Sequence, residues 1–306
     1  MPAALDFLRP TSLAEAISLL SSTEGAQPVA GATDVWVGIR SKKHTPKALV
    51  SLKGIPNLRF ILPDRDTDTY EGKADGVAAN SGVLLGAATT HGDVEDSPWM
   101  KSHFPAVHQA CSGLGSRQVR NVATVGGNIC NAAPCADSAV GLLLYDAGLV
   151  LAGPQGEREL ALADFFVGPG ETRLGPAELL KEIRVPAPGP RTFAYYWKHT
   201  RRKGVELPLL GVGVRVTLDE DGVVTCARIS LGVCAPMPAR STEAEKVLEG
   251  KKLTAQLAQE AGEVAARNAL VRDTWRGRAW YRREMVRVLV PRVIGLSGAL
   301  DSVSGK

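Results

Sequence analysis

The feature that most constrains the fold is a change of pattern near residue 180. Between Val212 and Val216 every second residue is valine, a turn of acidic residues and glycine follows at 219–222, and a second apolar run covers 223–231. Alternation with a period of two, interrupted by such a turn, is typical of paired antiparallel strands. The sequence therefore predicts an antiparallel sheet in the second part of the chain.

Helical patterns follow this hairpin and also open the chain. Three helices are expected after the hairpin, at 241–248, 254–268 and 280–290. Pro291 is expected to end the last of them, because proline cannot donate to the helix ladder. At the start, a capping box over 12–15 predicts a helix to about Ser22. The rest of the first part, to about residue 176, has an α/β pattern with its densest glycines at 113–127.

Length, charge and motifs narrow the class of protein. The 306 residues suffice for about two domains. The net charge of +4 sits in no long run, so no nucleic-acid partner is expected. The longest apolar stretch, 139–153, is interrupted by Asp146 and is too short to span a membrane. Motifs of zinc proteases, α/β-hydrolases and P-loop NTPases are absent, and no catalytic residue or metal site is predicted.

The number and spacing of the cysteines indicate the cellular compartment in which the protein is expected. There are five, with no Cys-x-x-Cys pair, and the first ten residues lack the basic and apolar regions of a secretory signal. An odd number of cysteines without such a signal is typical of reduced thiols, so we expect a cytoplasmic protein.

Two turns of small residues are the candidate ligand site: Val29 to Asp34, after a short predicted strand, and Thr124 to Asn128. Small side chains leave main-chain N–H groups uncovered, and several such groups aimed at one point bind a phosphate. The pair Gly126-Gly127 would let a pyrophosphate approach closely, with a positive φ at Gly127. Each turn taken alone favours the simpler interpretation of a tight turn that binds nothing, and neither matches the dinucleotide fingerprint of the Rossmann fold.

Together the two turns resemble a known family, the flavoprotein subunits of molybdenum hydroxylases. The first resembles its first FAD loop, and the second, with the preceding Arg120-Asn121-Val122-Ala123, resembles its second. The family includes the medium subunits of carbon monoxide, xanthine and nicotinate dehydrogenases and of 4-hydroxybenzoyl-CoA reductase. The resemblance runs nearly end to end, including the segments 7–20, 85–90, 178–183 and 280–283.

The resemblance implies an α+β fold. A two-part FAD-binding domain of the vanillyl-alcohol-oxidase (PCMH) type would cover 1–176, with subdomains of about 1–58 and 59–176. A smaller C-terminal domain, like that of carbon monoxide dehydrogenase flavoproteins, would cover 177–290, followed by a tail at 291–306.

The resemblance also implies which residues bind FAD. They are Val29, Ala30, Gly31, Ala32, Thr33, Asp34, Val35, Leu114, Thr124, Val125, Gly126, Gly127, Asn128, Asp137, Ile183 and Lys198. Leu114 would contact the flavin, Asp137 would bind the adenosine part and Lys198 would lie near the flavin ring. The residues alone leave alternatives open: Asp137 could be an N-terminal helix charge, and Lys198 a solvated lysine.

Two departures from the family pattern stand out. Ala32 replaces a second glycine found in many relatives. Cys130 and Cys135 lie where relatives often have small residues, and they could mark an extra redox or cluster site. We favour packing beside the cofactor, because a cluster needs four thiolates and the other cysteines are scattered.

The function implied is that of an FAD-carrying electron-transfer subunit. A large partner subunit would hold a molybdenum–pterin cofactor, a small one two [2Fe-2S] clusters, and the assembly would be a dimer of heterotrimers. Two alternatives stay open: a stand-alone FAD-dependent oxidoreductase of the same superfamily, and a nucleotide-binding structural subunit without redox activity.

Overall fold

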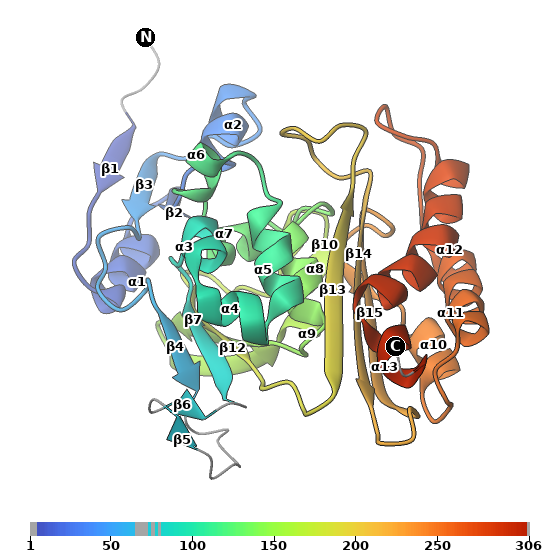
Figure 1. Cartoon of the computed structure of the whole chain (residues 1–306). Helices are drawn as coiled ribbons and strands as arrows, with labels where there is room; N and C mark the ends of the chain where they lie inside the picture. The colour runs from blue at the N-terminus through green and yellow to red at the C-terminus, as the bar shows by residue number, and fades with distance from the viewer. Residues whose placement is uncertain (1–4, 65–72, 75–76, 79–80, 305–306) are drawn as a thin grey trace.

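The computed structural model describes residues 5–64, 73–74, 77–78 and 81–304, and the chain forms two parts that lie side by side (Figure 1). The first contains a small parallel sheet, a five-stranded antiparallel sheet and most of the short helices. The second is a four-stranded antiparallel sheet with long helices on its outer face. This confirms the predicted α+β class.

The N-terminal sheet is parallel, with the strand order β1-β3-β2. Its elements are β1 (Asp6–Leu8), α1 (Leu13–Ser22), β2 (Ala26–Val29), α2 (Val35–Arg40) and β3 (Ala48–Ser51). Helix α1 begins at the predicted cap, where Ser12 Oγ accepts from the Glu15 amide at 3.1 Å. The Glu15 carboxylate accepts from the Thr11 amide, at 2.7 Å, rather than from Ser12 as a capping box requires.

The larger sheet of the first part has five antiparallel strands. In spatial order they are β4 (Ile61–Asp64), β7 (Gly82–Gly86), β12 (Leu179–Val185), β8 (Gly148–Gly153) and β9 (Gly156–Ala161). Two short pairs accompany it: β5 (Lys73–Ala74) with β6 (Val77–Ala78), and β10 (Phe166–Gly168) with β11 (Glu171–Thr172).

Short helices of the first part enclose a core with this sheet. They are α3 (His91–Asp96), α4 (Pro98–His103), α5 (Pro105–Ser112), α6 (Arg117–Arg120), α7 (Val125–Cys130), α8 (Asp137–Leu143) and α9 (Leu162–Phe165). Large side chains such as Phe104, Leu142 and Phe165 are fully buried in this core.

The position of β12 corrects the expected domain boundary at residue 176. Ile183 of β12 pairs with Leu85 of β7 on one side and with Leu149 of β8 on the other. The strand is therefore central to the first sheet, and the first part extends at least to Val185. Sheet membership depends on partners distant in sequence, so the local change of pattern near residue 180 does not reveal it.

The second sheet confirms the predicted hairpin. Its strands are β13 (Thr192–His199), β14 (Leu210–Leu218), β15 (Val224–Gly232) and β16 (Ala239–Arg240), in that spatial order. Strand β14 pairs with β15 in antiparallel register, with Val214 opposite Ile229.

Both faces of β14 are buried, because the sheet stands between the first part and the helices of the second part (Figure 1). Val212, Val214 and Val216 lie in the core shared with the terminal helices. On the other face small residues allow close approach: a Cβ added to Gly213 would lie 2.9 Å from Leu144 of the first part.

Four helices complete the second part. They are α10 (Thr242–Leu248), α11 (Ala255–Asn268), α12 (Ala279–Leu296) and α13 (Ala299–Ser304). Helix α12 does not end at Pro291 as expected but continues for five residues. Here α11 crosses closely, since a Cβ at Gly262 would lie 2.7 Å from the Arg287 carbonyl and 2.8 Å from the Pro291 ring. Packing on α11 holds α12 together where proline removes a hydrogen bond.

The segment 291–306, expected as a tail after the C-terminal domain, contributes to the core of the second part. Val293, Ile294 and Ala299 are fully buried in the second core. Among the described helices, none combines the length and the apolar character needed to cross a membrane.

Candidate functional site

The first turn connects β2 to α2 and exposes a run of main-chain donors. The six amides of residues 30–35 donate no hydrogen bond to any described part of the chain, and the first helical amide that does is Trp36, to the Ala32 carbonyl at 3.0 Å. Ala32 is in the left-handed region, with φ of 61°. A left-handed residue in such a turn directs successive N–H groups toward a common point, the arrangement that binds anions.

Within the described residues, no side chain of this turn accepts a hydrogen bond from its amides. Asp34 precedes α2 but makes no capping hydrogen bond, and desolvation raises the pKa of its carboxyl. Val29 is buried, and Ala30, Gly31, Thr33 and Val35 are half-buried. An anion at the turn would therefore be held by the main chain rather than by these side chains.

The second turn differs, because its amides are already used. Val125 donates to the Thr89 carbonyl at 2.9 Å and Gly126 to the Ala87 carbonyl at 3.1 Å. Gly127 donates to the Oγ1 of Thr124, the cap of α7, at 3.0 Å, and Asn128 to the Thr124 carbonyl at 3.0 Å. Gly127 is helical, without the positive φ expected from the sequence. This turn cannot offer the set of free donors that we expected.

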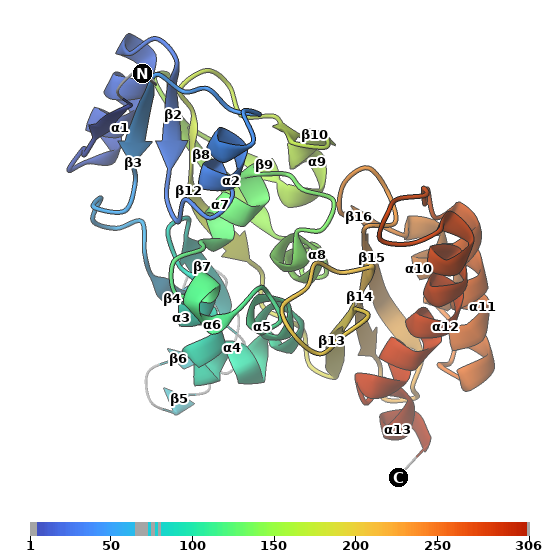
Figure 2. The same cartoon turned by 90° about the horizontal axis from the view of Figure 1, so that it is seen from above.

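The two turns meet through Gly31, which precedes α2 and packs against the segment that connects α6 to α7 (Figure 1, Figure 2). A Cβ at Gly31 would lie 2.1 Å from the Val122 carbonyl oxygen and 2.8 Å from Ala123 Cα. Only glycine permits this contact. The structure thus brings together the two predicted loops, with the first resting on the segment that leads into the second.

His91 supports the same segment. Its amide and its Nδ1 both bond to the Ala123 carbonyl, each at 3.0 Å, and the side chain is fully buried. Its Nε2 is buried without a partner, and burial lowers its pKa to about 4. The sequence analysis assigns no role to His91, and only its place directly after the segment 85–90 could have indicated one.

Asp137 and Lys198, distant in sequence, form a buried ion pair across the two parts. Lys198 Nζ lies 2.8 Å from Asp137 Oδ2, and the Tyr196 hydroxyl donates to Oδ1. Burial raises the pKa of Asp137 against the opposing effects of Lys198 and Tyr196. Lys198 is therefore not the solvated lysine of the alternative interpretation.

The ion pair limits what Asp137 offers to a ligand. Both of its oxygens have partners, and the residue is 3% exposed. It is also the first residue of α8, where a helix favours negative charge. Its contact with adenosine stays a prediction. The sequence analysis missed Tyr196. Residues two positions apart on a strand lie on the same face, so the position of Tyr196 relative to Lys198 could have indicated it.

Leu114 belongs to a segment held from both sides. Lys198 Nζ donates to the Gly113 carbonyl and Arg120 Nη1 to the Leu114 carbonyl, each at 3.0 Å. Arg120 is itself fixed by two bonds to the Glu95 carboxylate, at 2.7 and 2.9 Å. The expected flavin contact at Leu114 is thus positioned by one residue beside the second loop and one from the second sheet.

Of the remaining residues, Ile183 is buried, whereas Asn128, Cys130 and Cys135 are half-buried. Ile183 is fully buried in the first core, so it could reach a ligand only through its main chain. Asn128 Oδ1 accepts from Ser138 at 2.7 Å and ties α7 to α8. Cys130 packs against the first core, where burial raises its pKa to about 12, and burial also raises that of Cys135.

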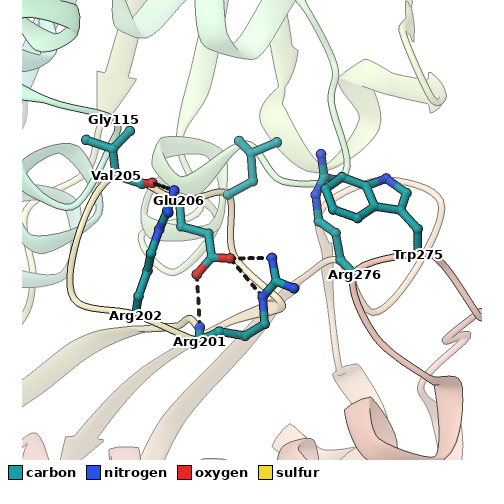
Figure 3. Close-up of a pocket in the computed structure, with 8 residues that line it drawn as sticks. Gly115, Arg201, Arg202, Val205, Glu206, Trp275 and Arg276 are labelled. Carbon is teal, nitrogen blue, oxygen red and sulfur yellow. Dashed lines mark hydrogen bonds and ion pairs between the residues drawn. The ribbon is translucent and has the colours of Figure 1, made fainter.

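A pocket opens beside Gly115, between the two parts (Figure 3). Its volume is about 330 Å³. The connection from β13 to β14 supplies Arg201, Arg202, Val205, Glu206 and Leu207, and the connection from α11 to α12 supplies Trp275 and Arg276. Figure 3 shows Arg201 paired with Glu206 on one side, with Trp275 and Arg276 on the other.

Comparison with known proteins identifies two family models along the chain. An FAD-binding domain of molybdopterin dehydrogenases matches residues 3–188, and the C-terminal domain of carbon monoxide dehydrogenase flavoproteins matches residues 195–296. The first match extends past β12 and agrees with the sheet pairing.

Individual relatives match over nearly the whole length. The putative xanthine dehydrogenase FAD-binding subunit of Escherichia coli (strain K12) is 30% identical over 300 residues, which is 97% of each chain. The carbon monoxide dehydrogenase medium chain of Afipia carboxidovorans is 30% identical, over 96% of each. A chain of the solved carbon monoxide dehydrogenase from Oligotropha carboxidovorans has a TM-score of 0.87 and 29% identity, covering 98% of this chain and 99% of that one. The chain therefore belongs to the FAD-binding medium subunits of the molybdenum hydroxylase (xanthine dehydrogenase) family.

Proposed function

We propose that this chain carries FAD and transfers electrons between [2Fe-2S] clusters of a partner subunit and an external acceptor or donor. The observation that carries the proposal is the run of six amides at residues 30–35 that have no partner among the described residues, with Gly31 packed against the segment that leads into the second loop. A pyrophosphate is the part of FAD that such a turn fits, because its negative charge needs several donors at short range.

The residues divide the work of holding the cofactor. The first loop would bind the pyrophosphate through its amides. The Val122–Ala123 segment, fixed by His91, would hold that loop in position. The Gly113–Leu114 segment would present an apolar contact to the ring. When bound, FAD supplies reversible electron transfer, and the protein supplies binding, orientation and a fixed environment.

Partner subunits are the second element of the proposal. A large subunit would hold the molybdenum–pterin cofactor and a small subunit two [2Fe-2S] clusters, in a dimer of heterotrimers. Support comes from the relatives, which are named as medium chains or FAD subunits of dehydrogenases. We also propose a cytoplasmic location, for which the five free cysteines are the support.

The test is a visible spectrum of the purified chain, with the cofactor released and identified, beside the Gly31→Ala variant. We expect FAD absorbance in the unmodified chain and its loss in folded Gly31→Ala. A colourless nucleotide would favour the non-redox alternative. Turnover of an organic substrate by the chain alone would favour the stand-alone oxidoreductase.

A further inference from the structure

A strained residue lies at the boundary between the two parts, directly after β15. Val233 has a φ of 64°, in the left-handed region. Of the described non-glycine residues in that region, it is the only one with a branched Cβ. For such a side chain this conformation is an outlier that persists only where the surroundings enforce it. Strain of this kind is concentrated at ligand-binding sites, so Val233 calls for a functional explanation.

The main chain of Val233 bonds to the first part of the molecule. Its amide donates to the Pro134 carbonyl at 2.8 Å, and Pro134 lies in the 131–136 connection between α7 and α8. Strand β15 ends beside α8, where the buried Ser230 Oγ donates to the Val140 carbonyl at 2.7 Å (Figure 2). On the other side, Cys234 is buried in the second core. Both neighbours of the strained residue are therefore fixed, and it cannot relax freely.

The 131–136 connection is also held at its two ends. Near its start the Ala132 carbonyl accepts from the Gly170 amide at 3.0 Å. Directly after it Asp137 is fixed by its buried ion pair with the second part. Val233 supplies the attachment in the middle, at Pro134. The connection leads from the second loop to the predicted adenosine contact, so its position decides how these two lie relative to each other.

Cys135, next to Pro134, shows what this connection faces. Burial raises the pKa of its thiol, Asp137 and Asp34 raise that pKa further, and Arg276 lowers it. The effect of a charge falls off with distance, so the thiol is near both carboxylates. Asp34 belongs to the first loop. Cys135 therefore lies between the loop expected to bind the pyrophosphate and the residue expected to bind adenosine.

We infer that Val233 is a positioning residue for FAD, which holds the Pro134 carbonyl so that the 131–136 connection lines the FAD site between the first loop and Asp137. The inference rests on the proposed function, since it requires that the chain binds FAD. Val233 acts through its hydrogen bond and not through contact with the cofactor. A connection held in this way needs little ordering when FAD binds, and such pre-organisation raises affinity.

Two substitutions in the full chain separate the amide of Val233 from its side chain. Val233→Gly is the conservative variant, because it keeps the amide and removes the strain. Its FAD affinity is expected within about twofold of the unmodified chain, with a higher urea midpoint. Val233→Pro removes the amide and imposes a negative φ. Its FAD dissociation constant is expected to rise about tenfold, the size that loss of one well-made hydrogen bond gives.

Arg191→Pro is the matched control for the proline variant. Arg191 is also left-handed, with φ of 53°, and it precedes β13 at the opposite end from Lys198. The variant imposes the same backbone change away from the 131–136 connection, so it is expected to lower stability and to keep FAD affinity. Flavin fluorescence titration measures affinity, and circular dichroism measures the folded fraction in every variant.

A second measurement needs no substitution. When FAD is added, hydrogen exchange of the Val233 amide is expected to slow at least tenfold relative to that of the Leu218 amide. The Leu218 amide is the matched control, because it donates to the Arg191 carbonyl at 3.1 Å within the second part. FAD is also expected to slow alkylation of Cys135 but not of Cys226, another half-buried thiol.

The inference is overturned if Val233→Pro binds FAD as tightly as Val233→Gly, or if FAD slows exchange at Val233 no more than at Leu218. If Val233→Pro does not fold, exchange and alkylation in the unmodified chain decide. These results leave the proposed function standing, because the unmodified chain still binds FAD. An unmodified chain that binds no FAD would instead overturn the proposed function, and the inference with it.

Discussion

The two small-residue loops are alike in sequence, yet their main chains do opposite things. The six amides of residues 30–35 have no partner among the described residues, whereas residues 125–128 use all four of theirs within the chain. The first loop is therefore suited to bind a ligand, and the second to support the first. In both loops a glycine allows close approach to another part of the backbone, Gly31 to Val122 and Gly126 to Ala87, so the loops differ in their amides and not in the use of glycine.

The largest effect is expected where the loops touch. Gly31→Ala places a Cβ 2.1 Å from the Val122 carbonyl, and neither backbone can move without disturbing the amides. We expect FAD retention to fall at least a hundredfold, about 2.7 kcal/mol, while the far sheet stays folded. Flavin fluorescence titration and circular dichroism measure the two quantities. Full FAD content in folded Gly31→Ala would show that the loops need not touch.

The contribution of His91, which holds the segment before the second loop, to the free energy of unfolding is expected to be lost at acidic pH. Burial lowers the pKa of His91 from its ordinary 6.5 to about 4. Between these two pH values the imidazole is protonated in the unfolded chain but neutral in the folded chain. Stability from this residue is complete above pH 6.5 and is lost as the pH falls toward 4. The shift corresponds to a total of about 3 kcal/mol, of which about 2 is lost by pH 5.

His91→Asn isolates this contribution from that of the carboxylates. The asparagine amide can still donate near the position of Nδ1 but does not titrate. Urea unfolding at pH 7 and pH 5 is expected to show a smaller acid loss in the variant, by about 2 kcal/mol. Equal losses would mean that His91 is accessible to protons in the folded chain.

A third prediction separates the two glycines of the second loop. Gly126→Ala would press against the Ala87 carbonyl, 2.5 Å away, and is expected to cost about 1–3 kcal/mol of stability. Gly127→Ala meets only the Thr124 hydroxyl, and the better helix propensity of alanine offsets a weakened cap, so the change is expected near zero. Thermal unfolding ranks the pair, and the reverse ranking would refute a supporting role for Gly126.

Local patterns in the sequence predict much of this fold. They do not predict which of the two loops has free amides and which one supports the other. The β14–β15 hairpin and the start of α1 follow from alternation and capping, which depend on neighbours along the chain. The sheet position of β12 and the passage of α12 through Pro291 depend on partners far away. For the same reason, free and engaged amides cannot be told apart in two turns of equally small residues.

The candidate site shows the same limit. Resemblance named Asp137 and Lys198 separately, and it did not indicate that they pair with each other or that Tyr196 completes the group. Arg120 was quoted as part of a motif, but its bond to the Leu114 carbonyl becomes visible only when α6 is placed in space. Pairings between distant residues are what the sequence alone leaves undetermined.

A smaller effect than that of Gly126→Ala is expected from relief of backbone strain in the first loop. Ala32 has a φ of 61°, where a side chain costs about 1–2 kcal/mol that glycine avoids, whereas glycine gives the unfolded chain more freedom, worth about 0.5–1 kcal/mol. Ala32→Gly is therefore expected to stabilise the protein by about 0.5–1 kcal/mol in urea unfolding. Ala30→Gly is the matched control, because Ala30 is not in the left-handed region, and it is expected to destabilise. If both variants destabilise equally, the left-handed conformation that directs the free amides is not the one the loop adopts in solution, and the contrast between the two loops fails with it.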